Sequence, residues 1–212
     1  DIVSVVSYES KVEVVIPPQR VDNHRDLVKK IEKIESAGGT FLSGGLEQGY
    51  ELISSIKDTL QDSSFVHRVI LLSDGLANEG IVDPQSLQRI ASDQLEENDI
   101  SLSTIGVGGD YNEELMTAMA IKGTGNYYFV ETAVDIPKIF EEELNGVQSL
   151  VSKNTTLAIT FPEEAVKLRQ VHHYNYSLVG NTISFQLSDV FSANEKAFLL
   201  EFDVRDGYSG DL

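Results

Sequence analysis

Apolar strands and amphipathic helices alternate from His67 to about Val151, and this alternation constrains the fold more than any other feature of the sequence. The run Val69–Leu72 is apolar at every position, which is typical of a strand covered on both faces in a parallel sheet. The pattern predicts strands at 67–72, 101–107 and 127–130 and helices at 83–97, 112–122 and 134–151. Parallel strands joined by right-handed helical crossovers form a doubly wound α/β sheet.

The residues before this alternation predict a hairpin and two helices. Ile2–Tyr8 is rich in β-branched residues, and a second apolar run follows at Val12–Ile16, so the two strands should pair antiparallel. We expect Pro17-Pro18 to end the second strand. A first helix should begin at an Asp22 or Asn23 cap and end at Gly38-Gly39, and a second should cover about 43–60. The predicted fold class is therefore α/β, a mostly parallel sheet with one antiparallel edge hairpin strand.

The pattern changes after Val151. Apolar residues alternate with polar ones at 157–161, 183–187 and 198–204, and Gly180-Asn181 predicts a tight turn before the second of these runs. These features indicate a small β unit of about four strands with one wet face. We therefore predict two domains, an α/β domain at 1–151 and a β-rich domain at 152–212 that forms part of a β-sandwich.

The composition excludes several classes of function. The chain has 16 Lys and Arg against 34 Asp and Glu, a formal net charge of −18, which disfavours binding to nucleic acid or to anionic membranes. The absence of cysteine excludes disulfides, zinc–thiolate sites and thiol catalysis. No apolar run approaches the roughly 20 residues that span a bilayer, so direct membrane insertion is not expected.

Two loops contain side chains suited to a metal ion. Thr40 lies in the segment between the first two helices, and Asp74 lies where the buried strand 67–72 ends. Ligands of such sheets bind at the carboxyl ends of the strands, and hydroxyl and carboxylate oxygens suit a hard cation such as Mg²⁺. Taken singly, Thr40 is also explained as a loop residue between helices and Asp74 as part of an Asp-Gly turn.

The two loops together resemble a known family. GGTFLSGGL, followed about 30 residues later by VILLSDG, is similar to the second and third loops of the metal-ion-dependent adhesion site of von Willebrand factor type A domains. DIVSVVSYES resembles the second strand of that family, and STIGVGGDYNEELMTAMAIKGTGNYYFV resembles its fifth strand, following helix and sixth strand. The resemblance covers residues 1 to about 151. It is strongest to bacterial members in which a β region follows directly, and LSDVFSANEKAFLLEFDV is similar to that region.

The resemblance implies a non-catalytic protein-binding module that serves adhesion or assembly. In the family, three loops hold Mg²⁺, or Ca²⁺ or Mn²⁺, and an acidic side chain of a partner protein completes the coordination. By resemblance, the Thr40 hydroxyl and the Asp74 carboxylate are metal ligands, the latter often acting through water. Residues of the same two loops are expected to support the site: Gly39, Ser43, Ser73 and Gly75.

The family pattern is incomplete in this chain. The first metal loop of the family carries an Asp-x-Ser-x-Ser motif after the first strand, and we interpret Asp1 as lying beyond that strand, loop and first helix. Two remaining side chains would leave most of the coordination shell to water. We therefore expect Mg²⁺ binding by this chain to be weak or absent, and we expect a gap in the sheet beside Ile2–Tyr8.

Two other functions are compatible with the same residues. The chain could be a phosphoryl-transfer enzyme or phosphoacceptor on a flavodoxin-like sheet, with Asp74 as the central carboxylate. It could also be a structural domain with a vestigial metal site. The sequence does not fix the cellular location, but it slightly favours the cell surface or periplasm over the cytoplasm.

Overall fold

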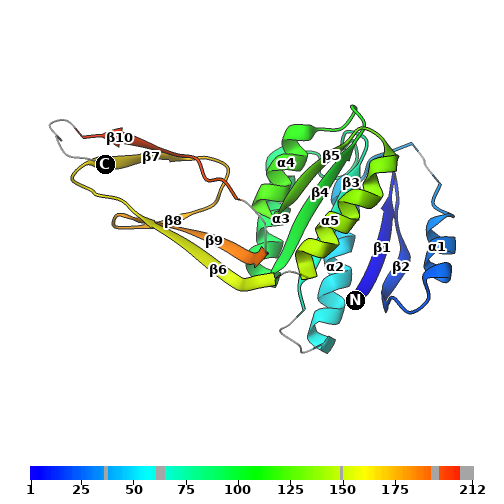
Figure 1. Ribbon diagram of the computed structural model, residues 1–212. Coiled ribbons are helices and arrows are strands. Elements are labelled where there is room, and N and C mark those ends of the chain that lie inside the picture. Colours follow the sequence, from blue (N-terminus) through cyan, green and yellow to red (C-terminus); the bar gives the residue numbers. More distant parts are fainter. Residues whose placement is uncertain (36–37, 61–64, 149, 192–195, 206–212) are drawn as a thin grey trace. The chain divides into compact units, whose positions relative to one another are not determined.

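The computed structural model describes residues 1–35, 38–60, 65–148, 150–191 and 196–205. The chain divides into two compact units, Asp1–Ile136 and Pro137–Leu212. The first contains a parallel sheet with its helices, and the second contains mainly antiparallel strands (Figure 1). The predicted domain boundary at 151–152 remains a prediction.

The predicted α/β fold class is confirmed in the first unit. Strands β3 (His67–Ser73), β4 (Ile100–Val107) and β5 (Thr124–Val130) form a parallel sheet in that order. Helix α3 (Pro84–Asn98) connects the first two strands and α4 (Glu113–Lys122) the next two. Sequential strands are therefore neighbours in the sheet, as expected for helical crossovers.

Local sequence explains why these elements form. The central strand β4 is buried at every position from Ile100 to Gly106, because sheet neighbours lie on both sides and helices pack on its face. Asp83 caps α3 as predicted: its side chain accepts a hydrogen bond from the Ser86 backbone N–H at 2.8 Å, and Pro84 occupies the first turn.

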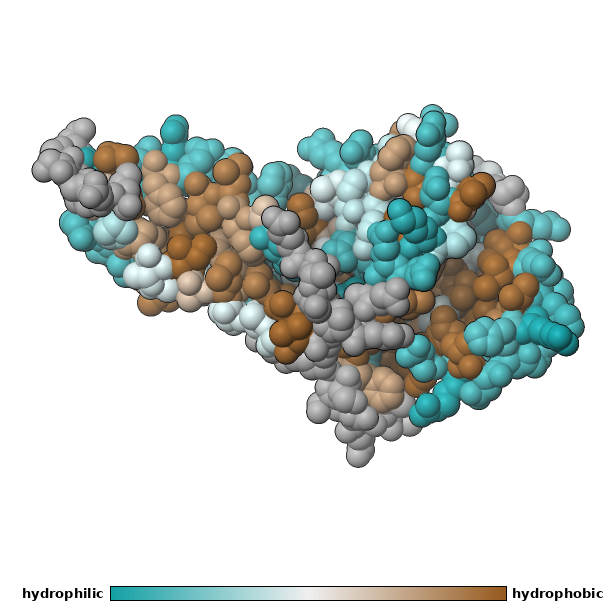
Figure 2. All heavy atoms as spheres, in the orientation of Figure 1, coloured by the Kyte–Doolittle hydropathy of each residue, from teal (hydrophilic) through white to brown (hydrophobic). Residues whose placement is uncertain are grey.

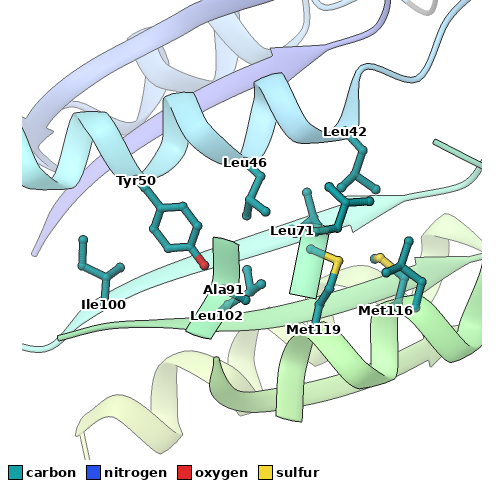
Figure 3. Packing of buried hydrophobic residues seen from close by; sticks show 11 residues of the cluster. Leu42, Leu46, Tyr50, Leu71, Ala91, Ile100, Leu102, Met116 and Met119 are labelled. Atoms are coloured by element: carbon teal, nitrogen blue, oxygen red, sulfur yellow. The ribbon is translucent and has the colours of Figure 1, made fainter. Parts of the chain in front are cut away.

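The core of the first unit is mainly aliphatic. Helix α2 (Leu42–Leu60) points Leu42, Leu46 and Tyr50 toward the strands, as Figure 3 shows. The strands, α3 and α4 contribute the remaining buried members: Leu71, Leu87, Ala91, Ile100, Leu102, Leu115, Met116 and Met119. Burying this many apolar side chains is the main stabilising term for the unit.

Strands β1 (Ile2–Tyr8) and β2 (Val12–Arg20) form the predicted antiparallel hairpin. The expectation that Pro17-Pro18 would end the second strand was wrong, since β2 continues to Arg20. The pairing is irregular between Val3 and Val5, opposite the two prolines. Proline is tolerated at such an irregularity because its missing N–H interrupts no regular ladder there. The hairpin forms a sheet separate from β3, β4 and β5, which agrees with the expected gap.

Helix α1 (His24–Ile31) is shorter than predicted, and the expected end at Gly38-Gly39 was wrong. It ends in tight turns in which the Ile34 N–H donates to the Ile31 carbonyl at 3.0 Å. Its apolar face is not buried: Val28 is 50% and Ile31 45% exposed. Helices are sustained mainly by packing of such a face, so this one is short.

Strand β5 contains a β-bulge at its amino end. Leu102 pairs with Thr124, yet Thr104 pairs with Tyr127, so β5 has one more residue than β4 over this stretch. Thr124 has a positive φ of 53°. Gly125 lies so close to β4 that an added Cβ would be 2.1 Å from the Leu102 carbonyl oxygen, which requires glycine.

The described residues of the second unit form two small antiparallel sheets. Strands β6 (Leu150–Thr160), β9 (Thr182–Phe191) and β8 (Ser177–Val179) form one sheet, and β7 (Val166–Val171) pairs with β10 (Leu200–Val204). Gly180, with a φ of 59°, and Asn181 make the predicted turn between β8 and β9. The unit has five strands in its described part rather than about four.

Aromatic rings fill the core of the second unit. Phe185 is 1% exposed, and the rings of Phe185 and Phe198 lie 4.8 Å apart between their centroids. Other apolar side chains of its strands reach the surface, and Figure 2 shows apolar groups gathered over this unit.

Helix α5 (Ile136–Gln148), preceded by the 3₁₀ turn η1 (Ala133–Asp135), ends before the predicted limit at 151. Strand β6 begins at Leu150. Within the described ranges, no helix is long and apolar enough to cross a membrane.

Candidate functional site

The carboxyl ends of the parallel strands meet at one edge of the sheet, here called the rim. Ser73, Gly106 and Phe129 are paired in register, so the ends of β3, β4 and β5 form one row. The end of β1 reaches the same rim, because the Tyr8 phenol donates a hydrogen bond to the Leu72 carbonyl. The strand ends thus bring residues far apart in sequence to one place.

Thr40 lies at this rim, next to the loop that follows β3. Its Oγ1 is 3.3 Å from where a Cβ on Gly75 would be. Asp74, the residue before that glycine, is exposed to solvent. The structure therefore brings together the two loops that the sequence singled out.

Two serines of these loops make hydrogen bonds that fix the backbone. Ser73 is 6% exposed, and its hydroxyl donates to the Gly75 carbonyl at 3.0 Å. Ser43 is 1% exposed, and its Oγ accepts a hydrogen bond from the Ile81 N–H at 3.0 Å. Each bond holds the loop after β3, the second by joining it to the start of α2.

Gly39 sits where the hairpin and the loop after β3 converge. A Cβ on Gly39 would be 2.2 Å from both the Glu79 Oε1 and the Ser10 Oγ. Those two side chains are hydrogen bonded to each other at 2.6 Å. A side chain at position 39 would therefore displace the Glu79 and Ser10 side chains and break the bond between them.

The Tyr8 side chain packs against the end of β3 and the start of α2. The pKa of Tyr8 is raised to about 12, mainly by burial; a hydrogen bond with the Ser73 side chain opposes the increase, and the negative charge of Asp74 adds to it. The ring also lies against Gly45 of α2, where an added Cβ would be 2.5 Å from Tyr8 Cδ1. Tyr8 therefore interacts electrostatically with Asp74 and packs between α2 and the end of β3.

The sequence matches the von Willebrand factor type A (VWA) domain family over residues 1–142. The chain belongs to this family. VWA domains are protein-interaction modules that carry a metal-ion-dependent adhesion site, and proteins of this family are generally non-enzymatic. The predicted family membership is thus confirmed.

The chain is similar to known proteins at low sequence identity. The chain is 28% identical to the Escherichia coli (strain K12) protein YfbK over 173 residues, 81% of this chain and 29% of that protein. A solved von Willebrand factor type A structure from Catenulispora acidiphila aligns with a TM-score of 0.69 at 15% identity, covering 96% of this chain and 48% of that one.

A further solved structure of similar fold contains zinc in its own MIDAS motif. Proximal thread matrix protein 1 from the mussel byssus, with a zinc-occupied MIDAS motif, aligns with a TM-score of 0.52 at 15% identity. The alignment covers 76% of this chain and 38% of that protein. The chain thus spans less than half the length of each of these three proteins.

The segment Asp99–Ser103 fits the Asp-x-Ser-x-Ser pattern of the first VWA metal loop. It lies at the edge of the sheet opposite the rim. These residues form the amino end of β4, opposite the rim. Their hydroxyls are engaged within the sheet: Ser101 Oγ accepts from Arg68 Nε at 3.0 Å, and Ser103 Oγ accepts from the Asn126 N–H at 3.1 Å. The segment is a buried strand and not a metal loop.

The candidate donor atoms at the rim of this VWA domain are oxygens, the element that a hard cation prefers. Thr40 offers a hydroxyl and Asp74 a carboxylate, the oxygen donors that Mg²⁺ prefers. Among the described residues, no group of three or more His, Cys, Asp and Glu side chains is arranged to hold a metal ion. The rim therefore brings two oxygen donors to adjacent loops.

Aromatic side chains flank the rim on the side of β5. The Tyr111 ring lies over Gly106, where an added Cβ would be 2.1 Å from it, and it stacks on Phe129 with centroids 6.2 Å apart. Its hydroxyl is 2.6 Å from the Tyr127 hydroxyl, and burial together with this bond raises the pKa of Tyr127. Phe129 is 55% exposed.

Sequence reasoning missed two residues of the rim, Tyr8 and Asn78. Tyr8 ends an apolar strand, which is a signal for a position at the carboxyl edge. Asn78 is a polar residue four positions after Asp74, but its partner is Thr40, and a contact between residues 38 positions apart has no local signature.

Proposed function

We propose that this VWA domain binds a partner protein through a divalent cation at its rim, with the Thr40 hydroxyl and the Asp74 carboxylate among the ligands. The observation that carries the proposal is the position of Thr40 Oγ1 against Gly75, beside Asp74. Both side chains stand where strands of the sheet end, which is the ordinary ligand position of open α/β sheets.

The cation would supply a positive charge at an otherwise acidic surface. The chain carries a net charge of −18, so an acidic partner residue would be repelled without a bridging ion. We propose Mg²⁺, with Ca²⁺ or Mn²⁺ as substitutes, because the donors are oxygen atoms. A partner carboxylate would then complete the coordination, and no bond is made or broken.

The side chains at the rim support only weak cation binding. Two protein side chains leave most of the coordination positions to water, and affinity depends on the number and charge of the ligands. We therefore expect dissociation constants in the millimolar range for this chain. Support of the loops by Gly39, Ser43, Ser73 and Gly75 would maintain the two ligands at the rim.

The test measures Mn²⁺ binding by electron paramagnetic resonance in the parent chain and in Asp74→Ala and Thr40→Val. We expect weak binding in the parent, its loss in Asp74→Ala and a reduction in Thr40→Val. Asp83→Ala serves as a control, since that carboxylate is also exposed but lies at the start of α3, away from Thr40 and Asp74 in sequence. Equal Mn²⁺ affinity in the parent and Asp74→Ala would reject the proposal.

The cellular location remains a prediction. A module that uses a divalent cation to bind a partner protein suits the cell surface or periplasm, and the absence of cysteine is compatible with either.

A further inference from the structure

The loop after β3 and the loop before α2 are joined by a reciprocal pair of hydrogen bonds. The Thr40 N–H donates to the Asn78 Oδ1 at 2.9 Å, and the Asn78 N–H donates to the Thr40 carbonyl at 3.2 Å. One residue therefore binds both backbone polar groups of Thr40. We call this arrangement the loop clasp.

Two further contacts beyond the loop clasp hold the same pair of loops. Ser43 Oγ accepts from the Ile81 N–H at 3.0 Å, and this hydroxyl is buried. Gly80, with a φ of 67°, lies so close that an added Cβ would be 2.1 Å from Phe41 Cε2. The left-handed backbone at Gly80 thus turns the loop back onto the segment that contains Thr40.

The position of Asn78 explains what the loop clasp does at the rim. The loop that carries Asp74 and Gly75 continues for only two residues before Asn78, and hydrogen bonds hold it at Ser73 and at Asn78. Thr40 is fixed through its backbone, which leaves its hydroxyl unengaged by the clasp and next to Gly75. The bonds thus hold the Thr40 hydroxyl against the loop that carries Asp74.

We propose that Asn78 is a positioning residue of the rim: it holds Thr40 beside Asp74 so that the two side chains share one cation. The inference rests on the proposed cation binding and extends it to a residue that touches no ligand. Residues that orient metal ligands without contacting the metal typically change metal affinity by about 10- to 100-fold when they are replaced.

The test is a double-mutant cycle on Mn²⁺ affinity, measured by electron paramagnetic resonance with the parent chain, Asn78→Ala, Thr40→Val and the double variant. We expect Asn78→Ala to weaken binding about 10-fold in the parent background. In the Thr40→Val background the same replacement should have little effect, because the hydroxyl that Asn78 positions is gone. Equal losses in both backgrounds would show that Asn78 acts on the fold in general, and would overturn the inference.

Two controls separate this inference from the proposed function. Leu76→Ala alters an exposed side chain of the same loop and should leave Mn²⁺ affinity unchanged. Asn78→Asp keeps an oxygen acceptor for the Thr40 N–H and should bind Mn²⁺ at least as well as the parent. Loss of binding in Asp74→Ala but no change in Asn78→Ala rejects the positioning role alone. No measurable binding in the parent, or no effect of Asp74→Ala, rejects both.

Discussion

The two compact units of this chain bury their apolar residues in different ways. In the first unit, β4 is buried from Ile100 to Gly106, and helices supply aliphatic partners. In the second unit, β9 alternates: Ile183, Phe185 and Leu187 are buried while Gln186 between them is exposed. A parallel sheet covered by helices can present polar groups only where its strands end, whereas an antiparallel sheet presents them along every strand.

This difference explains where candidate chemistry is found. The loops that contain Thr40, Asp74 and Asn78 all lie at the carboxyl ends of parallel strands in the first unit. The second unit disperses its polar side chains. Its His172, for example, is engaged with Glu201 across two paired strands, with Nε2 and Oε1 2.7 Å apart. A ligand site requires convergent polar groups, and the strand ends of the first unit bring such groups together.

The largest expected effect tests whether the aromatic core belongs to the second unit alone. Phe185→Ala should lower the free energy of unfolding of this unit by about 4 kcal/mol, because it removes a buried ring and leaves a cavity. Hydrogen exchange followed by mass spectrometry should show lost protection in β6, β8 and β9. The neighbouring exposed Gln186→Ala should show none, and equal loss in β3, β4 and β5 would contradict the division into two units.

The reciprocal experiment replaces a buried aliphatic residue of the first unit. Leu102→Ala should cost about 3 kcal/mol, since Leu102 is fully buried among α2, α3 and α4. Denaturation in urea measures the loss. The same chemical change at Leu76, which is 58% exposed, should cost less than about 0.5 kcal/mol. Similar costs at both positions would show that β4 is not the centre of the packing.

The smallest effect concerns a polar atom inside the aliphatic core. The Tyr50 hydroxyl is buried with no hydrogen-bond partner in the described part of the chain, and burial raises its pKa above the ordinary 10.0. Tyr50→Phe should therefore raise the free energy of unfolding by about 1 kcal/mol near neutral pH. A decrease in stability would instead indicate a bonded hydroxyl.

The pH dependence of the same variant has a definite sign. Above pH 10 the unfolded chain ionises Tyr50 before the folded chain does, so the parent loses stability as the pH rises. Tyr50→Phe should lose less over this range, as measured by urea denaturation on either side of pH 10.

Much of the first unit could be predicted from sequence because its signals are local. The uniformly apolar run at Val69–Leu72 identified a parallel strand, although only Leu71 of these four residues is fully buried, and Asp83-Pro84 identified a helix start to the residue. The Gly38-Gly39 helix end failed because α1 has no buried face to sustain it beyond Ile31. The end of β2 at Pro17 failed because pairing irregularities accommodate prolines, and no local pattern reveals them.

The sequence alone could single out Thr40 and Asp74 as candidate site residues. It could not predict the hydrogen bonds of Asn78 that join their loops. Thr40 and Asp74 stand in glycine-containing loops beside apolar elements, which mark ligand positions in α/β sheets. The role of Asn78 depends on Thr40 being within hydrogen-bond distance, and only the folded backbone determines that. Tyr8 likewise donates a hydrogen bond to the Leu72 carbonyl, and these residues belong to two separate sheets. No local sequence pattern predicts a contact between residues so far apart in the chain.

The bulge at the amino end of β5 determines which aromatic residues face the rim. Side chains alternate along a strand, so the extra residue in Thr124–Asn126 sets the parity of everything that follows. A single-codon deletion there would turn Tyr127 and Phe129 to the opposite face and bring Tyr128 beneath Tyr111. A one-residue deletion at the far end of the strand would thus change which aromatic side chains lie next to the rim. None of those aromatic residues would itself be substituted.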